Sequence, residues 1–190
     1  MLRRATLTTA SLFAVLGAAA CAPGSTPAPT PTISEETTTS AAPQVQNPKN
    51  LKAVSDACQL LTQDQFSQLG GSAGAKPPES DTSGLGEPVC DWRNDAFSTS
   101  VTINITHGGP AAIEGLAGAS DNFKPTQVDG YPGARVDEQS DLCRIELAVA
   151  EDQTVAINYF KNAGGTPEMD DPCGFAEKIA SEALKNIPDA

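Results

Sequence analysis

Apolar and polar residues alternate along two stretches in the second half of the chain, and this alternation is typical of strands with one dry and one wet face. Within residues 97–107, every second position in the middle of the stretch is Val or Ile. Residues 142–150 alternate in the same way, and residues 154–160 follow them after a short polar turn. The second stretch therefore predicts a β-hairpin.

A spacing of three and four residues predicts a helix at each end of the same region. Thr62 and Gln65 have the capping-box spacing and indicate a helix that ends near Gly70. Near the C-terminus, Asp171 and Pro172 place a capping carboxylate before a proline at the first helical position. The apolar residues that follow form one stripe along this second helix: Phe175, Ile179, Ala183, Leu184 and Ile187.

Shorter signals complete the pattern. Residues 89–93 predict the hairpin partner of residues 97–107, and two short strands are expected to flank a tight turn within residues 127–136. Pro110 starts a further short helix. Residues 72–88 are polar and rich in Gly and Pro, which is typical of a loop.

This order of elements indicates an α+β fold. We expect an antiparallel β-sheet of five or six strands, with the N- and C-terminal helices packed on one face and two disulfides. The other face of the sheet is expected to be partly open or covered by loops. Residues 54–190 are long enough for one hydrophobic core and too short for two, so they are expected to form a single α+β domain.

The first 21 residues have a different pattern, which indicates a bacterial lipoprotein signal peptide. Arg3 and Arg4 form a short basic start, and the uncharged residues 7–20 lead into Cys21. This run suits the core of a secretory signal and is short for a membrane span of about 20 residues. We expect cleavage before Cys21 and a lipid such as palmitate on its sulfur. The alternative is an ordinary signal cut after Ala20, which leaves a free terminal thiol.

Residues 21–53 are rich in Pro, Thr, Ser and Ala, and we expect them to be a disordered tether between the lipidated Cys21 and the domain. Such a segment buries too little apolar surface to offset the entropy of ordering. Its Thr-rich run resembles O-glycosylated linkers, and a bare solvated spacer is the equal alternative. The protein is thus expected to be extracytoplasmic and lipid-anchored to the cell membrane.

The charge of the chain excludes some partners. Its 12 Lys and Arg are outnumbered by 24 Asp and Glu, which gives a formal net charge of −12. Loss of a signal peptide that contains Arg3 and Arg4 makes the mature chain more acidic still. This charge argues against binding nucleic acid, whose phosphates would be repelled, and against docking on anionic lipid head groups. We expect a monomer held at the membrane through its lipid alone.

Four cysteines remain once Cys21 is assigned to the lipid anchor: Cys58, Cys90, Cys143 and Cys173. The chain has no Cys-x-x-Cys pair and a single histidine, which disfavours a zinc site or a redox dithiol. Two structural disulfides are the better account. Of the three ways to pair four cysteines, we predict Cys58 with Cys90 and Cys143 with Cys173, because each pair would tie a terminal helix to a strand beneath it.

No catalytic constellation is complete in the sequence. His107 is the only histidine, and no Gly-x-Ser-x-Gly elbow is present to hold a nucleophile. Acidic residues cluster within residues 137–141 and 168–171, but neither group has the ligand spacing of a calcium loop. A carboxylate pair for glycoside cleavage is set by the fold, and the sequence marks none. We therefore predict no catalytic residues, no metal site and no cofactor.

Three aromatic residues are candidates for the floor of a ligand pocket: Trp92, Tyr131 and Tyr159. Trp92 lies two residues from Cys90. A Trp beside a half-cystine more often packs on the disulfide in the core, which is the alternative role for this side chain.

Several short motifs resemble the actinobacterial lipoprotein family known as domain of unknown function 3558. They are Cys58-Gln59-Leu60-Leu61-Thr62, Cys90-Asp91-Trp92, Gly130-Tyr131-Pro132-Gly133-Ala134, Cys143 within a strand, and Asp171-Pro172-Cys173. The similarity covers nearly all of residues 54–187, and Gly133 is a small departure from the turn motif. The resemblance implies location and disulfide pairing but no activity. More loosely, the element order is similar to α+β lipoproteins of the Mog1 and PsbP types, which are mainly binding modules.

The sequence as a whole favours a non-enzymatic envelope lipoprotein. We expect it to bind a small apolar ligand or an envelope protein at the outer face of the cytoplasmic membrane. The alternatives are a hydrolase of cell-wall polymers that uses unidentified carboxylates, and a structural accessory of a membrane complex.

Overall fold

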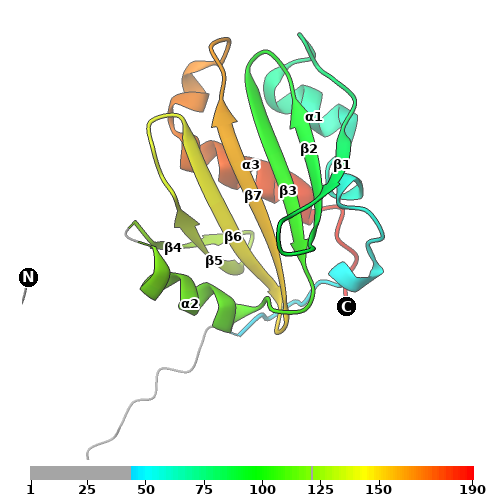
Figure 1. Ribbon diagram of the computed structural model, residues 1–190, viewed down its shortest axis with the longest axis vertical. Coiled ribbons are helices and arrows are strands. Elements are labelled where there is room, and N and C mark those ends of the chain that lie inside the picture. The colour runs from blue at the N-terminus through cyan, green and yellow to red at the C-terminus, as the bar shows by residue number, and fades with distance from the viewer. Residues whose placement is uncertain (1–43, 121) are drawn as a thin grey trace, which may run out of the picture. The chain divides into compact units, whose positions relative to one another are not determined.

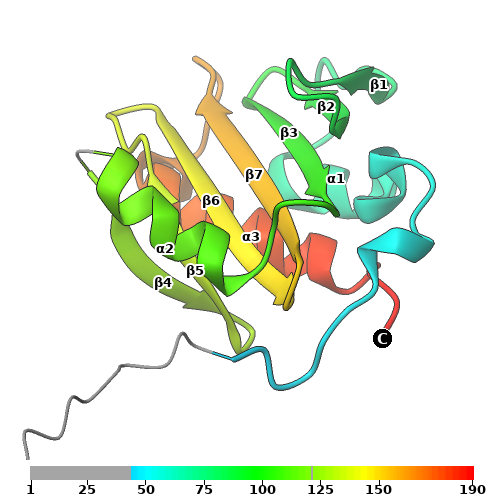
Figure 2. The same cartoon turned by 60° about the horizontal axis from the view of Figure 1, so that its bottom comes forward.

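The computed structural model describes residues 44–120 and 122–190, which form one antiparallel sheet with helices on both sides (Figures 1 and 2). The strands lie in the order β1-β2-β3-β7-β6-β5-β4. Their bounds are β1 Glu79–Thr82, β2 Pro88–Arg93, β3 Phe97–Asn104, β4 Lys124–Val128, β5 Tyr131–Val136, β6 Leu142–Ala150 and β7 Gln153–Lys161. The helices are α1 Gln63–Gly70, α2 Pro110–Ala119 and α3 Pro172–Leu184, with short 3₁₀ helices η1 Leu51–Ala53, η2 Ala57–Leu60 and η3 Pro167–Asp170. Within the described ranges, no helix combines the length and apolar character needed to span a membrane.

The sheet has seven strands, so the prediction of five or six was wrong. The additional strand is β1, which lies inside residues 72–88, the stretch predicted to be a loop. All four of its side chains are exposed, so no apolar residue recurs with the period of two that predicts the other strands. It pairs with β2 at one edge of the sheet, where Ser80 lies opposite Cys90.

The N- and C-terminal helices α1 and α3 lie on one face of the sheet, which we call the packed face. Phe66 of α1 and Phe175 of α3 both contact Phe97 of β3, with ring centroids 4.9 and 5.3 Å apart. The apolar stripe of α3 packs over β6 and β7 and is buried. The predicted capping box at Thr62 and the capping carboxylate of Asp171 are both present.

Helix α2 lies on the opposite face of the sheet, over β5 and β6, and we call this the open face (Figure 2). The helix begins at Pro110, as predicted, and continues through Gly118 to Ala119. It lies near the end of the sheet at which β6 turns into β7 (Figure 1). Towards the other end, the side chains of β2, β3, β7 and β6 border a hollow on this face.

Both disulfides predicted from the sequence are present. Cys58 of η2 is bonded to Cys90 of β2, and Cys143 of β6 is bonded to Cys173 of α3. Each bond joins an element on the packed face to a strand beneath it. The pairs span 32 and 30 residues of sequence, so each cross-link removes about 3.5 kcal/mol of loop entropy from the unfolded chain in the chain-entropy account.

The packed region extends further towards the N-terminus than the predicted boundary at residue 54. Val45 is buried and Leu51 is fully buried. The backbone N–H of Lys49 donates to the carbonyl of Val149 at 2.7 Å, and the N–H of Leu51 donates to the side chain of Gln153 at 2.6 Å. Residues 44–53 therefore belong to the domain and not to the tether. The predicted signal peptide, Cys21 and the rest of the predicted tether lie outside the described residues.

Candidate functional site: the open face of the sheet

The register of the sheet arranges the open face in rows that run across four strands. One row contains Asp91, Ser100, Asn158 and Arg144, taken from β2, β3, β7 and β6. The next row contains Val89, Thr102, Ala156 and Glu146 from the same strands. Successive side chains of a strand point to opposite faces, so these polar residues alternate with core residues in sequence. The open face therefore displays hydroxyl, amide and charged groups on a rigid backbone.

A wide hollow of about 510 Å³ lies over the part of this face that carries Asp91, Ser100 and Asn158. Asp91 and Arg93 form an ion pair of 3.7 Å on β2, and Asn158 of β7 donates to the hydroxyl of Ser100 at 3.2 Å. Phe160 also lines the hollow and is 46% exposed. This half of the open face combines polar groups with apolar surface, to which Leu142 and Phe160 contribute.

A smaller and more enclosed hollow of about 170 Å³ lies beneath α2 and the turn that connects β1 to β2. We call it the charged hollow. Its lining residues are Leu85, Glu87, Thr102, Asn104, Ala112, Leu116, Arg144, Glu146, Thr154 and Ala156. Leu85 is at the tip of the turn and is 87% exposed, although it borders the hollow. Glu146 and Arg144 come from β6, in the middle of the sheet.

Glu146 is the acidic residue buried most deeply in this hollow, with 7% of its surface exposed. Arg144 donates a hydrogen bond to its carboxylate and forms an ion pair with it. Burial raises the pKa of Glu146 above the ordinary value; the charge and hydrogen bond of Arg144 oppose the rise, and the nearby charges of Glu87 and Asp137 add to it. One donor is left over, because the Nε atom of Arg144 is buried without a hydrogen-bond partner.

Helix α2 forms part of the roof of the charged hollow, and hydrogen bonds hold this helix in place at both of its ends. At its N-terminal end, the N–H of Gly109 donates to the hydroxyl of Thr154 at 2.7 Å. Gly109 has a φ of 86°, and a Cβ at this position would lie 2.0 Å from the carbonyl oxygen of Glu151. A larger residue is therefore excluded on two grounds, and the close approach fixes where α2 starts.

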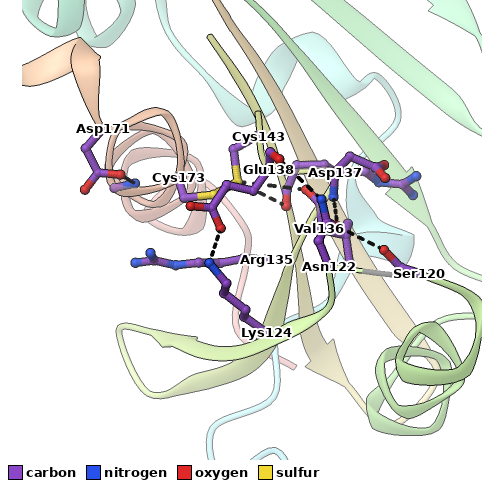
Figure 3. Close-up of polar contacts among 12 residues, drawn as sticks. Ser120, Asn122, Lys124, Arg135, Val136, Asp137, Glu138, Cys143, Asp171 and Cys173 are labelled. Carbon is purple, nitrogen blue, oxygen red and sulfur yellow. Dashed lines mark hydrogen bonds and ion pairs between the residues drawn. A yellow bond between two sulfur atoms is a disulfide. The ribbon is translucent and has the colours of Figure 1, made fainter. Parts of the chain in front are cut away.

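The C-terminal end of α2 is joined to the end of β5 through Asn122 (Figure 3). The side-chain oxygen of Asn122 accepts from the N–H of Asp137 at 2.8 Å and from the hydroxyl of Ser120 at 3.1 Å, and its amide nitrogen donates to the carbonyl of Glu138 at 3.3 Å. Lys124 forms an ion pair of 2.6 Å with Glu138 beside this contact. These bonds position the helix over the sheet.

The three aromatic residues proposed from the sequence are all buried, and the structure does not bring them together around one hollow. Trp92 contacts Phe66 with ring centroids 5.2 Å apart, and Tyr159 contacts Phe97 at 5.8 Å, so both belong to the aromatic cluster of the packed face. Burial raises the pKa of Tyr159 to about 12.

Tyr131 lies apart from this cluster, on β5. Its hydroxyl donates to the carbonyl of Asn47 at 2.8 Å, which ties the N-terminal segment to the sheet. Burial raises the pKa of Tyr131 above its ordinary value, and the positive charge of Lys49 partly opposes the rise.

Sequence reasoning missed Arg144 and Glu146. A signal for them was present, since they are the only charged residues in the nine-residue strand β6, which is otherwise apolar. Alternation assigns both side chains to the face opposite Cys143 and Ile145, where solvent was expected. The sequence does not show that α2 and the β1–β2 turn would cover that part of the face.

Among residues 44–120 and 122–190, no group of three or more His, Cys, Asp or Glu side chains is placed to hold a metal ion. Acidic residues 137–141 and 168–171 instead make pairwise contacts. Glu138 pairs with Lys124, and Glu168 pairs with Lys178 at 2.8 Å. Arg135 is bound by both oxygens of Glu177 at 2.7 Å, which fastens β5 to α3.

Comparison with known proteins gives one family and no named relative. The family described as Protein of unknown function (DUF3558) has a model that matches residues 16–186 of this chain. No curated protein and no solved structure gives a significant match. The match to the family spans both predicted disulfides and the whole sheet. The chain belongs to this family of proteins of unknown function.

Proposed function

We propose that this protein is an extracytoplasmic, lipid-anchored binding module that holds a small molecule on the open face of its sheet, with no catalytic step. One observation carries the proposal. The described residues include two exposed large hydrophobic side chains, Leu85 and Phe160, and both border hollows on this face. Apolar surface that remains exposed in a concave place next to fixed polar groups is typical of ligand sites.

The charged hollow is the part of this face best suited to enclose a ligand. Its size of about 170 Å³ admits a compound of a few heavy atoms. Leu85, Ala112 and Leu116 supply apolar surface, while Glu146 and Arg144 supply fixed polar groups from a central strand. A few polar groups among apolar walls is the usual composition of a small-molecule site.

A hydrolase that uses paired carboxylates is less well supported. Glu87 and Glu146 border the same hollow, which is the kind of placement that glycoside cleavage needs. The hollow is small for a polymer chain, however, and Glu146 is already bonded to Arg144. Binding is the function that uses this geometry without rearrangement.

The location rests on the lipoprotein signal that ends at Cys21 and on the two disulfides, which persist in oxidising compartments. Replacement Cys21→Ala should release the protein into the medium. Retention of the Cys21→Ala protein at the membrane would refute the lipid anchor and leave the binding proposal standing.

Native mass spectrometry tests the binding proposal. The protein should be purified without denaturant from cells that produce it, beside the variant Ala156→Leu, which fills the charged hollow from its floor. The matched control is Ala111→Leu, on the exposed side of α2. We expect a bound small molecule on the wild type and on Ala111→Leu, and none on Ala156→Leu. Absence of a ligand from all three, or its retention by Ala156→Leu, would overturn the proposal.

A further inference from the structure

We propose that the charged hollow selects a small organic cation, namely a primary amine that also carries a hydroxyl or carbonyl oxygen. The inference rests on the proposed binding function and narrows its ligand to one chemical class. It is drawn from the balance of charges around the hollow, from the burial of Glu146 and from the polar side chains of Thr102 and Asn104.

The charges that face the hollow are predominantly negative. Glu146 and Glu87 border it, and Asp137 is close enough to act on the Glu146 carboxyl. Arg144 is the one cation among the residues that line it. The lining residues of β3, β7 and α2 are uncharged: Thr102, Asn104, Thr154, Ala156, Ala112 and Leu116. A carboxylate or phosphate ligand would therefore meet net repulsion, and an ammonium group would meet net attraction.

Burial makes the attraction effective. Glu146 is more than nine-tenths buried, and its one ionic partner is Arg144. Taking the Glu146 carboxylate out of water costs several kcal/mol, and Arg144, whose side chain is 39% exposed, stays partly in water and offsets only part of that cost. A second positive charge beside Glu146 offsets this cost. Binding of a cationic ligand beside Glu146 would account for why the fold keeps this charged pair.

Polar side chains add the second requirement. Thr102 and Asn104 border the hollow and offer a hydroxyl and an amide to an oxygen of the ligand, while the ammonium of the same ligand donates to Glu146. Aliphatic carbons between the two groups would lie against Leu85 and Leu116, which border the same hollow.

A set of three matched probes tests the inference by NMR titration of backbone amides in the protein. Aminobutanol carries the ammonium and the hydroxyl, pentanol replaces the ammonium by a methyl group, and hydroxypentanoate replaces it by a carboxylate. We expect aminobutanol to shift the amides of Thr102, Ala156 and Glu146 in a saturable manner. Pentanol should bind at least about tenfold more weakly than aminobutanol, as expected for loss of a charge-assisted hydrogen bond. Hydroxypentanoate should not bind.

Variants at Glu146 and Glu87 test whether the NMR shifts caused by aminobutanol depend on these two carboxylates. Glu146→Gln keeps the size and hydrogen-bonding ability of the side chain and should weaken aminobutanol binding about tenfold or more. Glu87→Gln, at the edge of the hollow, should weaken it less, and it provides the test if Glu146→Gln does not fold. Glu168→Gln removes a carboxylate outside the hollow, one that pairs with Lys178, and should leave binding unchanged.

The outcomes separate this inference from the proposed function. Stronger binding of pentanol or hydroxypentanoate at these amides would overturn the amine as ligand and keep the open face as a binding site. Binding of aminobutanol that is equal in the wild type and in both Glu146→Gln and Glu87→Gln would overturn the inference as well. Failure of all three probes to shift these amides would count against both.

Discussion

Ile145 and Glu146 are neighbours on β6, both are buried, and they point to opposite faces of the sheet. On the packed face, Ile145 lies in a continuous hydrophobic core that both disulfides join to the helices. On the open face, Glu146 shares a small hollow with Arg144 and a partial roof. The difference suggests a division of labour in which the packed face supplies stability and the open face can therefore keep charged groups that do not contribute to it.

The largest effect on stability is expected from the aromatic cluster. Phe97 is fully buried and contacts Phe66, Tyr159 and Phe175, so Phe97→Ala should lower the free energy of unfolding by about 3 to 5 kcal/mol. Its counterpart Phe160→Ala, on the open face, should lower it by about 1 kcal/mol or less. Urea denaturation of both variants measures the difference, and equal losses would contradict the division between the faces.

Removal of one disulfide is the next test of the packed face. A double variant with Cys143→Ala and Cys173→Ala should lose about 3.5 kcal/mol, because the loop that the bond closes regains its entropy in the unfolded chain. Urea denaturation of the wild type and of the double variant, both without reductant, gives this value because the Cys58–Cys90 bond stays intact in each. A loss below about 1 kcal/mol would show that the bond between β6 and α3 adds little to stability.

Gly133 tests the close contact of β5 with β6 behind the open face. A Cβ at this position would lie 2.2 Å from the carbonyl oxygen of Glu146 and 2.5 Å from a methyl group of Leu147. We expect Gly133→Ala to cost about 1 to 3 kcal/mol, since the neighbour is backbone. Gly115→Ala on α2 meets no atom within 4 Å and should stabilise by up to about 1 kcal/mol. Thermal unfolding compares the two, and a stable Gly133→Ala would be inconsistent with the described register.

A smaller effect should appear in the pH dependence of stability. Burial raises the pKa of Glu146 in the folded protein, so the folded state binds more protons than the unfolded state between the ordinary and the raised value. Stability contributed by this residue is therefore present at low pH and falls as the pH rises through that window. Glu146→Gln should lack the fall, whereas Glu138→Gln should retain it. Identical pH profiles for Glu146→Gln and the wild type would contradict the burial of an ionisable group here.

The sequence predicts the packed face well for physical reasons. The alternation in residues 142–150, the apolar stripe of α3 and the caps at Thr62 and Asp171 are local signals that agree with the burial seen in the structure. Burial of one face of each element leaves a pattern in the sequence, because apolar residues must recur with the period of that element.

The open face could be predicted only in part. The four residues of β1 are all exposed and leave no apolar pattern, so neither the strand nor the turn that carries Leu85 was expected. The burial of Glu146 depends on α2 and on this turn, which are distant in sequence. A polar residue on a wet face looks the same in sequence whether or not another element later covers it.

The central claim is that Arg144 and Glu146 serve binding and not stability, and a double variant with Arg144→Met and Glu146→Leu tests it most directly. Urea denaturation should give a free energy of unfolding equal to that of the wild type or higher, because apolar side chains replace a buried carboxylate and its partly exposed arginine partner. NMR titration of the same variant should show no saturable binding of aminobutanol. A loss of stability comparable to that of Phe97→Ala, or binding that persists, would contradict the account.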